Sequence, residues 1–190
     1  FTREDQDEYA LTSLARAQRA QKTNAFKNEI ATVFIETRKS AKEVIVDEQP
    51  GTARPDKIPK LKPAFREGGT VTAANSSSIS DGAAALVLAS EEMAIAKNLT
   101  IRGRILGHAS HAQAPNIFTT APVFAVLKLL RQLGWSKEDV DLWEVNEAFA
   151  VVPLAFMREV GISHDIVNIN GGACALGHPV GASGARIMVT

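Results

Sequence analysis

The sequence predicts an α/β fold in which helices pack on a sheet, and three observations support this class. From residue 71 onward, short apolar runs typical of buried strands alternate with segments of helical periodicity. Apolar residues make up 45% and charged residues 22% of the 190 residues, which is the composition of a globular protein that buries a core. No short repeat period or low-complexity tract points to another architecture.

The first third of the chain predicts a helix, a strand pair and a long surface segment. Residues 2–24 form the helix, because Thr2 can cap it and acidic residues such as Asp5 crowd its first turn, where the helix dipole favours them. Residues 30–46 predict two strands joined by a polar turn. Residues 47–70 contain four prolines and little periodicity, so we expect a surface segment of the kind that often carries function.

From residue 71, a small polar run leads into alternating strands and helices. Helix ends are marked by Pro122 in a first turn and by Gly134 and Gly161 after a last turn. A glycine-rich turn and a final short helix end the chain. The expected strands are 83–89, 101–105, 142–145 and 166–169, and the expected helices are 91–97, 122–133 and 147–160.

Composition also narrows the partners and the location. The 21 basic and 21 acidic residues cancel, so we expect neither nucleic acid nor an anionic membrane as a partner. No apolar run approaches the roughly 20 residues of a membrane-spanning helix. Cys174 is the single cysteine and cannot form a disulfide within the chain. We therefore expect a cytoplasmic protein, or a mitochondrial one if a transit peptide preceded Phe1, and we interpret the chain as a piece of a longer protein.

The strongest chemical signal is the turn at residues 170–186, which holds five of the 13 glycines. Glycines allow the backbone to approach a ligand closely, although a tight strand-to-helix turn needs small residues for its own sake. His178 favours the ligand interpretation, because Pro179 stiffens its loop and an imidazole can bind an oxyanion or take a proton from a thiol. A structural histidine is the alternative, and we assign that role to His108, His111 and His164.

A second polar group stands between an apolar strand and an apolar helix, at Asn146 and Glu147. Asn146 can cap the helix, or its amide can hold an ordered water in a pocket, since an amide offers both donors and an acceptor.

Three motifs in order resemble those of the thiolase family, and within it the acetyl-CoA acetyltransferases, also called acetoacetyl-CoA thiolases. They are residues 146–150, residues 177–184 about 30 positions later, and residues 69–85. The resemblance implies a thiolase-type layered α/β fold of two similar sheet halves with helices, truncated at both ends. Residues 1–69 would belong to a loop domain, residues 70–98 to the end of the N-terminal half, and residues 99–190 to the C-terminal half.

The resemblance also assigns roles to two polar residues. His178 matches the histidine that activates the nucleophilic cysteine and helps to bind the thioester oxygen of the second substrate. Asn146 matches the asparagine whose bound water completes the same oxyanion hole, where fixed donors stabilise developing charge.

Four further positions match residues that contact coenzyme A or the acyl group. Ser77 matches a contact to the pantetheine arm, and Phe149 and Phe118 match positions that line the acyl and pantetheine pocket. Arg38 resembles a residue near the nucleotide end of coenzyme A. The alternatives are plain core packing for the phenylalanines and an ordinary surface charge for Arg38.

Two cysteines of the family mechanism have no match here. The resemblance places the nucleophile before Phe1 and the cysteine base after Thr190. We interpret Cys174 as a small buried hydrophobe, with a catalytic role as the alternative. The 190-residue chain by itself is therefore expected to be inactive and poorly folded.

The activity that the resemblance implies is a reversible Claisen condensation of two acetyl-CoA to acetoacetyl-CoA and coenzyme A, or thiolysis of short 3-ketoacyl-CoA. The alternatives are a non-catalytic lipid- or acyl-CoA-binding protein on a thiolase scaffold, and a 3-ketoacyl-CoA thiolase of fatty-acid β-oxidation with longer substrates. A ketoacyl synthase is disfavoured, because that group has histidine in place of Asn146. No metal or other cofactor is implied, coenzyme A thioesters are substrates, and a homodimer or homotetramer is expected.

Overall fold

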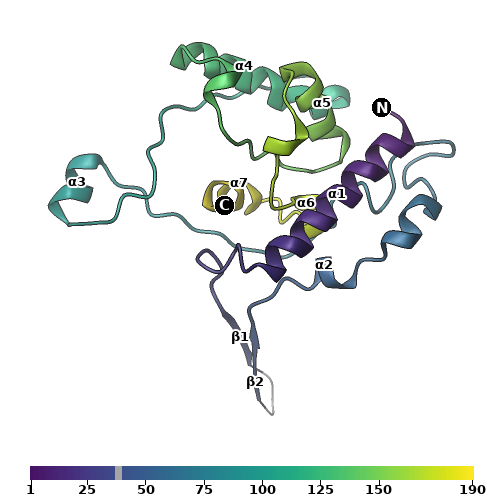
Figure 1. Cartoon of the computed structure of the whole chain (residues 1–190), viewed down its shortest axis with the longest axis horizontal. Helices are drawn as coiled ribbons and strands as arrows, with labels where there is room; N and C mark the ends of the chain where they lie inside the picture. Colours follow the sequence, from purple (N-terminus) through teal and green to yellow (C-terminus); the bar gives the residue numbers. More distant parts are fainter. Residues whose placement is uncertain (37–39) are drawn as a thin grey trace.

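The computed structural model describes residues 1–36 and 40–190, and the predicted nucleotide contact at Arg38 lies outside these ranges. The first helix, α1 (Arg3–Lys22), forms one side of the molecule (Figure 1). Thr2 and Asp5 cap it reciprocally, each side chain bonded to the other's backbone N–H. This helix confirms the prediction for residues 2–24.

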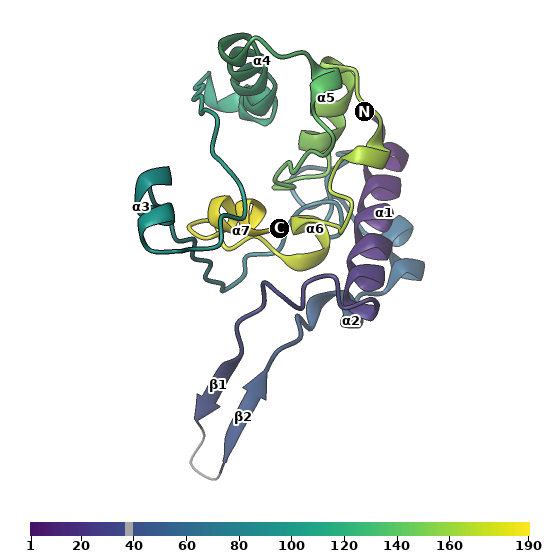
Figure 2. The same ribbon diagram turned by 60° about the vertical axis from the view of Figure 1, so that its left-hand side comes forward.

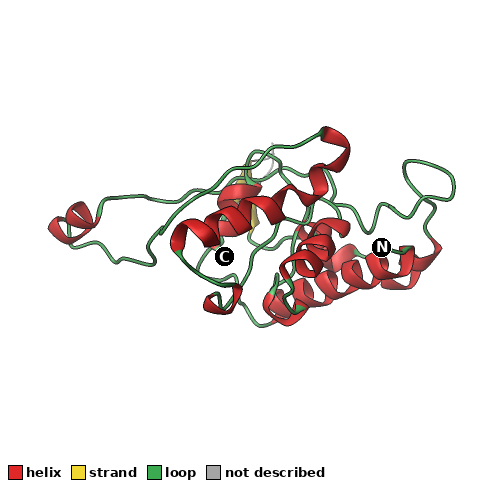
Figure 3. Ribbon diagram, turned by 90° about the horizontal axis from the view of Figure 1, so that it is seen from above, coloured by secondary structure: helices red, strands yellow, loops and turns green. Residues whose placement is uncertain are grey.

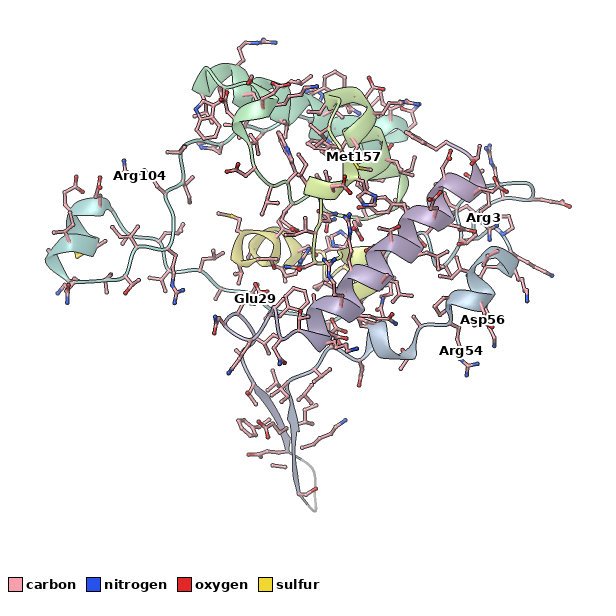
Figure 4. All side chains as sticks on the ribbon, viewed as in Figure 1. Arg3, Glu29, Arg54, Asp56, Arg104 and Met157 are labelled. Carbon is pink, nitrogen blue, oxygen red and sulfur yellow. The ribbon has the colours of Figure 1, made fainter. Side chains whose placement is uncertain are left out.

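The predicted strand pair is an antiparallel hairpin that projects from the body of the molecule (Figure 2). Strand β1 (Val33–Glu36) pairs with β2 (Ala41–Val44), with Val33 opposite Val44. The surface segment that follows contains a single helical turn, α2 (Gln49–Thr52), and the 3₁₀-helix η1 (Pro55–Lys60), both packed against α1. Arg3, which Figure 4 labels at the start of α1, fixes η1 by donating to the carbonyls of Ile58 and Leu61.

The predicted strands at 83–89 and 101–105 are wrong for this chain. These residues run as extended, exposed backbone on either side of the short helix α3 (Glu91–Ala96), which stands apart from the other helices (Figure 1). Their apolar side chains face solvent, as Val87 does with 92% of its surface exposed. A strand needs a neighbour to pair with its backbone groups, and no described residue lies beside these segments in a ladder. Helix α3 itself confirms the prediction for 91–97.

The largest apolar core lies between two helices, α4 (Ala121–Leu133), which the 3₁₀-helix η2 (Pro115–Thr120) precedes, and α5 (Val151–Val160). Gly134 and Gly161 end α4 and α5 in the left-handed conformation, as the sequence predicted. The buried members of this core are Val123, Trp143, Val145, Val152, Phe156, Val160 and Val167.

The predicted strands at 142–145 and 166–169 are reduced to one parallel bridge between Trp143 and Val167, beside which lies the 3₁₀-turn η4 (His164–Ile166). A further 3₁₀-turn, η3 (Lys137–Asp139), links α4 to this region. The backbone N–H of Trp143 donates to Ile166 O at 2.8 Å, and that of Asn168 donates to Trp143 O at 2.9 Å. Two bonds hold the segments together but do not extend into a ladder, because the backbone leaves the extended conformation at Asn168, where φ is +48°.

Helix α5 begins at Val151 rather than at residue 147, because residues 147–150 bond to another loop. The Ala150 N–H donates to the carbonyl of Asn75 at 2.8 Å. The glycine-rich turn then carries the one-turn helix α6 (Ala173–Leu176), which packs against α1, and the last helix α7 (Ser183–Val189), labelled beside the C-terminus in Figure 1. Seen from above, the described chain consists mainly of helices and loops (Figure 3). No helix of the described ranges has the length and apolarity required to cross a membrane.

Candidate active site

The fold brings His178 and Asn146 together, although 32 positions separate them. The loop after residue 75 positions the histidine: the His178 N–H donates to the carbonyl of Ser78 at 3.0 Å, next to a parallel bridge between Ile79 and His178. The Asn146 Nδ2 atom then lies 3.3 Å from His178 Nε2. The two residues that the sequence proposed as catalytic therefore share one hydrogen bond.

Hydrogen-bond partners define the protonation of the His178 ring. Its Nδ1 lies 2.6 Å from Ser183 Oγ, and this hydroxyl donates to the carbonyl of Pro179 at 3.2 Å. Because the Ser183 hydroxyl donates to that carbonyl, we assign the ring proton to Nδ1, which then donates to Ser183 Oγ. Nε2 is then unprotonated and accepts from the Asn146 amide. This neutral tautomer presents a basic nitrogen beside Asn146. Sequence reasoning missed Ser183, whose only signal is its place five residues after His178.

The turn before His178 requires glycine. Gly177 has φ +86°, and a Cβ built there would lie 2.1 Å from Ser80 Oγ. A side chain at this position would push the 78–80 loop away and with it the backbone that holds His178. The glycine-rich turn is therefore a tight turn that needs small residues, and the same tight geometry positions the His178 imidazole.

Ser77 and Phe149 join the motif loop to the same site. The Ser77 N–H and its hydroxyl both donate to the carbonyl of Ala148, at 3.1 and 3.0 Å, and residues 76 and 149 form an antiparallel bridge. Ser77 thus lies beside the segment that contains Asn146, and its hydroxyl donates to the Ala148 carbonyl of that segment.

Aromatic side chains form one wall of the site. Phe149 meets Phe118 and Phe65 edge to face, with ring centroids 6.2 and 6.1 Å away. Phe118 is 49% exposed, which is more than core packing would leave. It lines a cavity of about 610 Å³ together with Asn146 and His111, and Ala148 also borders it. The structural role assigned to His111 did not foresee this position.

Glu144 lines the same cavity and titrates near neutral pH. Burial raises the pKa of its carboxyl to about 7, and the positive charge of Arg186 offsets part of that effect. Its Oε2 atom is buried and has no hydrogen-bond partner among the described residues, and the same holds for Asn146 Oδ1. Two acceptors on this wall therefore remain available to donors within the cavity.

Cys174 has the properties of a structural cysteine. Its side chain packs near the carbonyl of Glu147, with Sγ 3.7 Å from that oxygen. Burial, followed by the nearby Glu147 charge, raises the pKa of the thiol well above its usual value. A thiol held in its neutral form is a poor nucleophile, which agrees with the interpretation of Cys174 as a small hydrophobe.

His164, to which the sequence assigned a structural role, contacts α1. His164 stacks on Tyr9 with ring centroids 4.7 Å apart, and burial lowers the pKa of its imidazole. Among residues 1–36 and 40–190, no three His, Cys, Asp or Glu side chains gather where they could hold a metal ion.

Comparison with known proteins places this geometry in context. The family model for the thiolase N-terminal domain matches residues 1–92, and the model for the thiolase C-terminal domain matches residues 99–190. The chain is 49% identical to acetyl-CoA acetyltransferase 2 of Arabidopsis thaliana, over all of this chain and 48% of that protein.

Solved structures confirm the predicted thiolase-type α/β class. The chain superposes on the crystal structure of the Bacillus anthracis acetyl-CoA acetyltransferase with a TM-score of 0.96 and 43% identity, covering all of this chain and 48% of the other. For Acat5 thiolase from Ascaris suum in complex with coenzyme A, the TM-score is 0.90 and the identity 41%, with the same coverage. The chain spans about half the length of the curated relatives it matches.

Proposed function

The chain belongs to the thiolase family, and on this premise we propose that its protein is an acyltransferase acting on coenzyme A thioesters. The specific reaction that we propose is the reversible Claisen condensation of two acetyl-CoA to acetoacetyl-CoA and coenzyme A. In the reverse direction, coenzyme A cleaves a short 3-ketoacyl-CoA.

The observation that carries this proposal is the contact between His178 Nε2 and Asn146 Nδ2, since Asn146 also lines the cavity. A neutral imidazole with an unprotonated Nε2, held here by a long hydrogen bond from the Asn146 amide, can take the proton of a thiol nucleophile. Once protonated there, it can donate to the oxygen of a second thioester as that oxygen gains charge. The Asn146 amide is a fixed second donor at the same place, so little reorganisation is needed when charge develops.

Substrate binding follows from the walls of the site. Phe118 and Phe149 offer apolar surface for a short acyl group and for part of the pantetheine arm. The loop that contains Ser77 lies beside them, as expected for a contact to that arm. The solved Ascaris suum relative is a complex with coenzyme A, which supports this ligand class for the present chain.

The proposal requires catalytic cysteines outside these 190 residues, because Cys174 is the single cysteine and its thiol is held neutral. We propose the division of the sequence into residues 1–69, 70–98 and 99–190 as the corresponding parts of the thiolase architecture. Homodimeric or homotetrameric assembly is part of the same proposal.

The test uses the full-length gene product and measures thiolysis of acetoacetyl-CoA. We expect His178→Ala and Asn146→Ala each to lower kcat by about 10²–10³, the usual effect of losing an oxyanion donor or a base. The matched control is His108→Ala, which removes an exposed histidine far from the motif residues in sequence and leaves turnover unchanged.

Two outcomes contradict the proposal. Turnover that survives both substitutions would exclude the assigned chemistry. Wild-type protein that binds acetyl-CoA without any turnover would instead favour the non-catalytic acyl-CoA-binding alternative.

A further inference from the structure

Glu147, which the mechanism above does not use, is fully buried beside the site. Its exposed fraction is 0%, and none of the ion pairs among the described residues includes it. A buried carboxylate without a cation is costly unless hydrogen bonds satisfy it.

Four donors converge on the two carboxylate oxygens. Oε1 accepts from the Tyr9 hydroxyl at 2.8 Å and from Asn168 Nδ2 at 2.9 Å. Oε2 accepts from the Ser13 hydroxyl at 2.7 Å and from the Cys174 backbone N–H at 3.0 Å. Each oxygen receives two hydrogen bonds, which is the pattern that suits a negatively charged acceptor.

These donors come from three separate parts of the chain. Tyr9 and Ser13 lie one turn apart on α1, Asn168 precedes the glycine-rich turn, and Cys174 is in α6. Ser13 extends the network, since its hydroxyl also accepts from the Gly172 N–H at 3.0 Å. The carboxylate thus ties both sides of the site to one rigid helix.

Gly172 shows how closely the turn approaches this carboxylate. A Cβ built on Gly172 would lie 2.4 Å from the Glu147 carboxyl carbon. Only glycine fits there without moving the carboxylate. One glycine of the motif is therefore explained by the space that Glu147 needs, and not by a bound ligand.

Both catalytic candidates depend on the segments held in this way. Asn146 precedes Glu147 directly, and the Asn168 side chain also brackets the Val145 backbone, accepting from its N–H and donating to its carbonyl, both at 2.8 Å. On the other side, the chain runs from Cys174 through α6 to His178. A shift at Glu147 would move these two segments independently and change the 3.3 Å contact between Asn146 and His178.

We propose that Glu147 is a positioning residue that sets the Asn146–His178 geometry by clamping their two segments to α1. The proposal rests on the proposed thiolase function. An apolar residue of similar size would often stabilise a fold as well as a buried charged group does. What an apolar residue cannot do is fix direction, because packing has no preferred hydrogen-bond geometry.

The main test is Glu147→Gln in the full-length gene product. Glutamine has nearly the same shape, but in either orientation its NH₂ group points at two donors. We expect kcat for acetoacetyl-CoA thiolysis to fall about 10²-fold, the usual cost of misplacing catalytic groups by about 1 Å, with KM changed less than about twofold. The control is Glu159→Gln, which alters an exposed glutamate of α5 and leaves both constants unchanged.

A second readout does not need turnover. In ¹⁵N-labelled wild-type protein, we expect the His178 ring signals of the Nδ1–H tautomer, and in Glu147→Gln we expect averaged signals of both tautomers. Far-UV circular dichroism verifies that the variant is folded. If the wild-type protein has no thiolase activity, the proposed function is wrong. The comparison of His178 ring signals between wild type and Glu147→Gln then still tests whether Glu147 positions His178.

A folded Glu147→Gln variant with wild-type kcat and wild-type His178 signals would overturn the proposal. If that variant does not fold, Ser13→Ala provides the milder test, since it removes one donor to Oε2 and keeps the charge. Changed His178 signals and a lower kcat in Ser13→Ala support the proposal, and unchanged values of both overturn it.

Discussion

Two regions of the molecule are held together by different forces. The buried face of α1 carries four polar side chains that are nearly inaccessible to solvent, beside apolar ones such as Leu14 and Ala17. The polar ones are Gln6, Asp7, Tyr9 and Ser13. The buried face of α5 is apolar and packs around Phe156. We call the polar side chains of α1 and their hydrogen-bond partners the polar layer, and the cluster around Phe156 the apolar layer. The candidate residues Asn146 and His178 lie on loops that the polar layer holds. Directional bonds fix where a loop lies, whereas packing mainly fixes how tightly elements are held.

The α1 layer reaches every loop of the candidate site. Asp7 accepts from the Asn75 side chain at 2.9 Å, and Tyr9 and Ser13 donate to Glu147. Arg16 donates to the carbonyls of Val167 and His164, at 2.6 and 3.0 Å. Each bond ends on a loop that leads into a motif, so α1 acts as a common support for segments far apart in sequence.

Removing the centre of the apolar layer should have the largest effect on stability. Phe156 is 1% exposed and meets Trp143 edge to face. We expect Phe156→Ala to lower the free energy of unfolding by about 3–5 kcal/mol, because it creates a cavity in a packed core. Urea unfolding of the full-length gene product, followed by fluorescence, measures this loss of stability. The matched variant Phe124→Ala, at a ring that is 49% exposed, should cost much less. Equal costs would mean that this cluster is not the core.

The contrast between two nearby carboxyls predicts a pH effect of intermediate size. Glu147 has four donors, while Glu144 has a buried oxygen without a partner, and burial raises the pKa of Glu144 to about 7. In this case the folded protein binds a proton more tightly than the unfolded chain, whose carboxyl has a pKa near 4.5. The contribution of Glu144 to the free energy of unfolding is therefore fully present below pH 4.5 and is lost as the pH rises through 7.

The stability lost over this window is on the order of 2 kcal/mol after allowance for partial solvent screening. Urea unfolding at several pH values between 4.5 and 8 measures the slope. Glu144→Gln should remove it, and Glu159→Gln should leave it in place. A wild-type slope that persists in Glu144→Gln would assign the titration to another group.

Within the polar layer, loss of a single donor should cost less. Tyr9→Phe removes one of the two hydrogen bonds to Glu147 Oε1 and one acceptor of the Asn168 amide. We expect a loss of about 1–2 kcal/mol in the free energy of unfolding, since a buried charged acceptor becomes partly unsatisfied. Chemical denaturation gives the value. A change below about 0.5 kcal/mol would show that the layer contributes no directional stability.

The smallest effect is expected at the aromatic wall, and it concerns substrate choice. Phe118 and Thr119 both line the cavity, and we expect this pair to favour short acyl groups, including 2-methyl-branched ones. Phe118→Met should change the ratio of kcat/KM for branched and straight substrates by about tenfold, in the range of one-methylene discrimination. Equal losses on both substrates would contradict a role of Phe118 in selectivity.

Local signals predicted the helices well. Thr2 with Asp5, Gly134 and Gly161 mark helix ends through interactions within a few residues, and each marks an end in the structure. The expected strands at 83–89 and 101–105 failed because pairing is not local. An apolar run indicates that a segment can be a strand. The backbone hydrogen bonds of a strand need a neighbouring segment, however, and the sequence pattern does not identify that neighbour.

The candidate site divides in the same way. The sequence by itself predicted which residues carry chemistry and determined the family, because His178 and Asn146 stand in motifs whose residue types and spacing resemble those of thiolases. Tertiary structure alone decided that Asn146 and His178 touch, that Glu147 gathers donors from three segments, and that Gly172 and Gly177 have no room for a side chain. The physical reason is that hydrogen-bond partners more than 20 positions apart leave no periodic trace in the sequence, whereas caps and turns are fixed by their immediate neighbours.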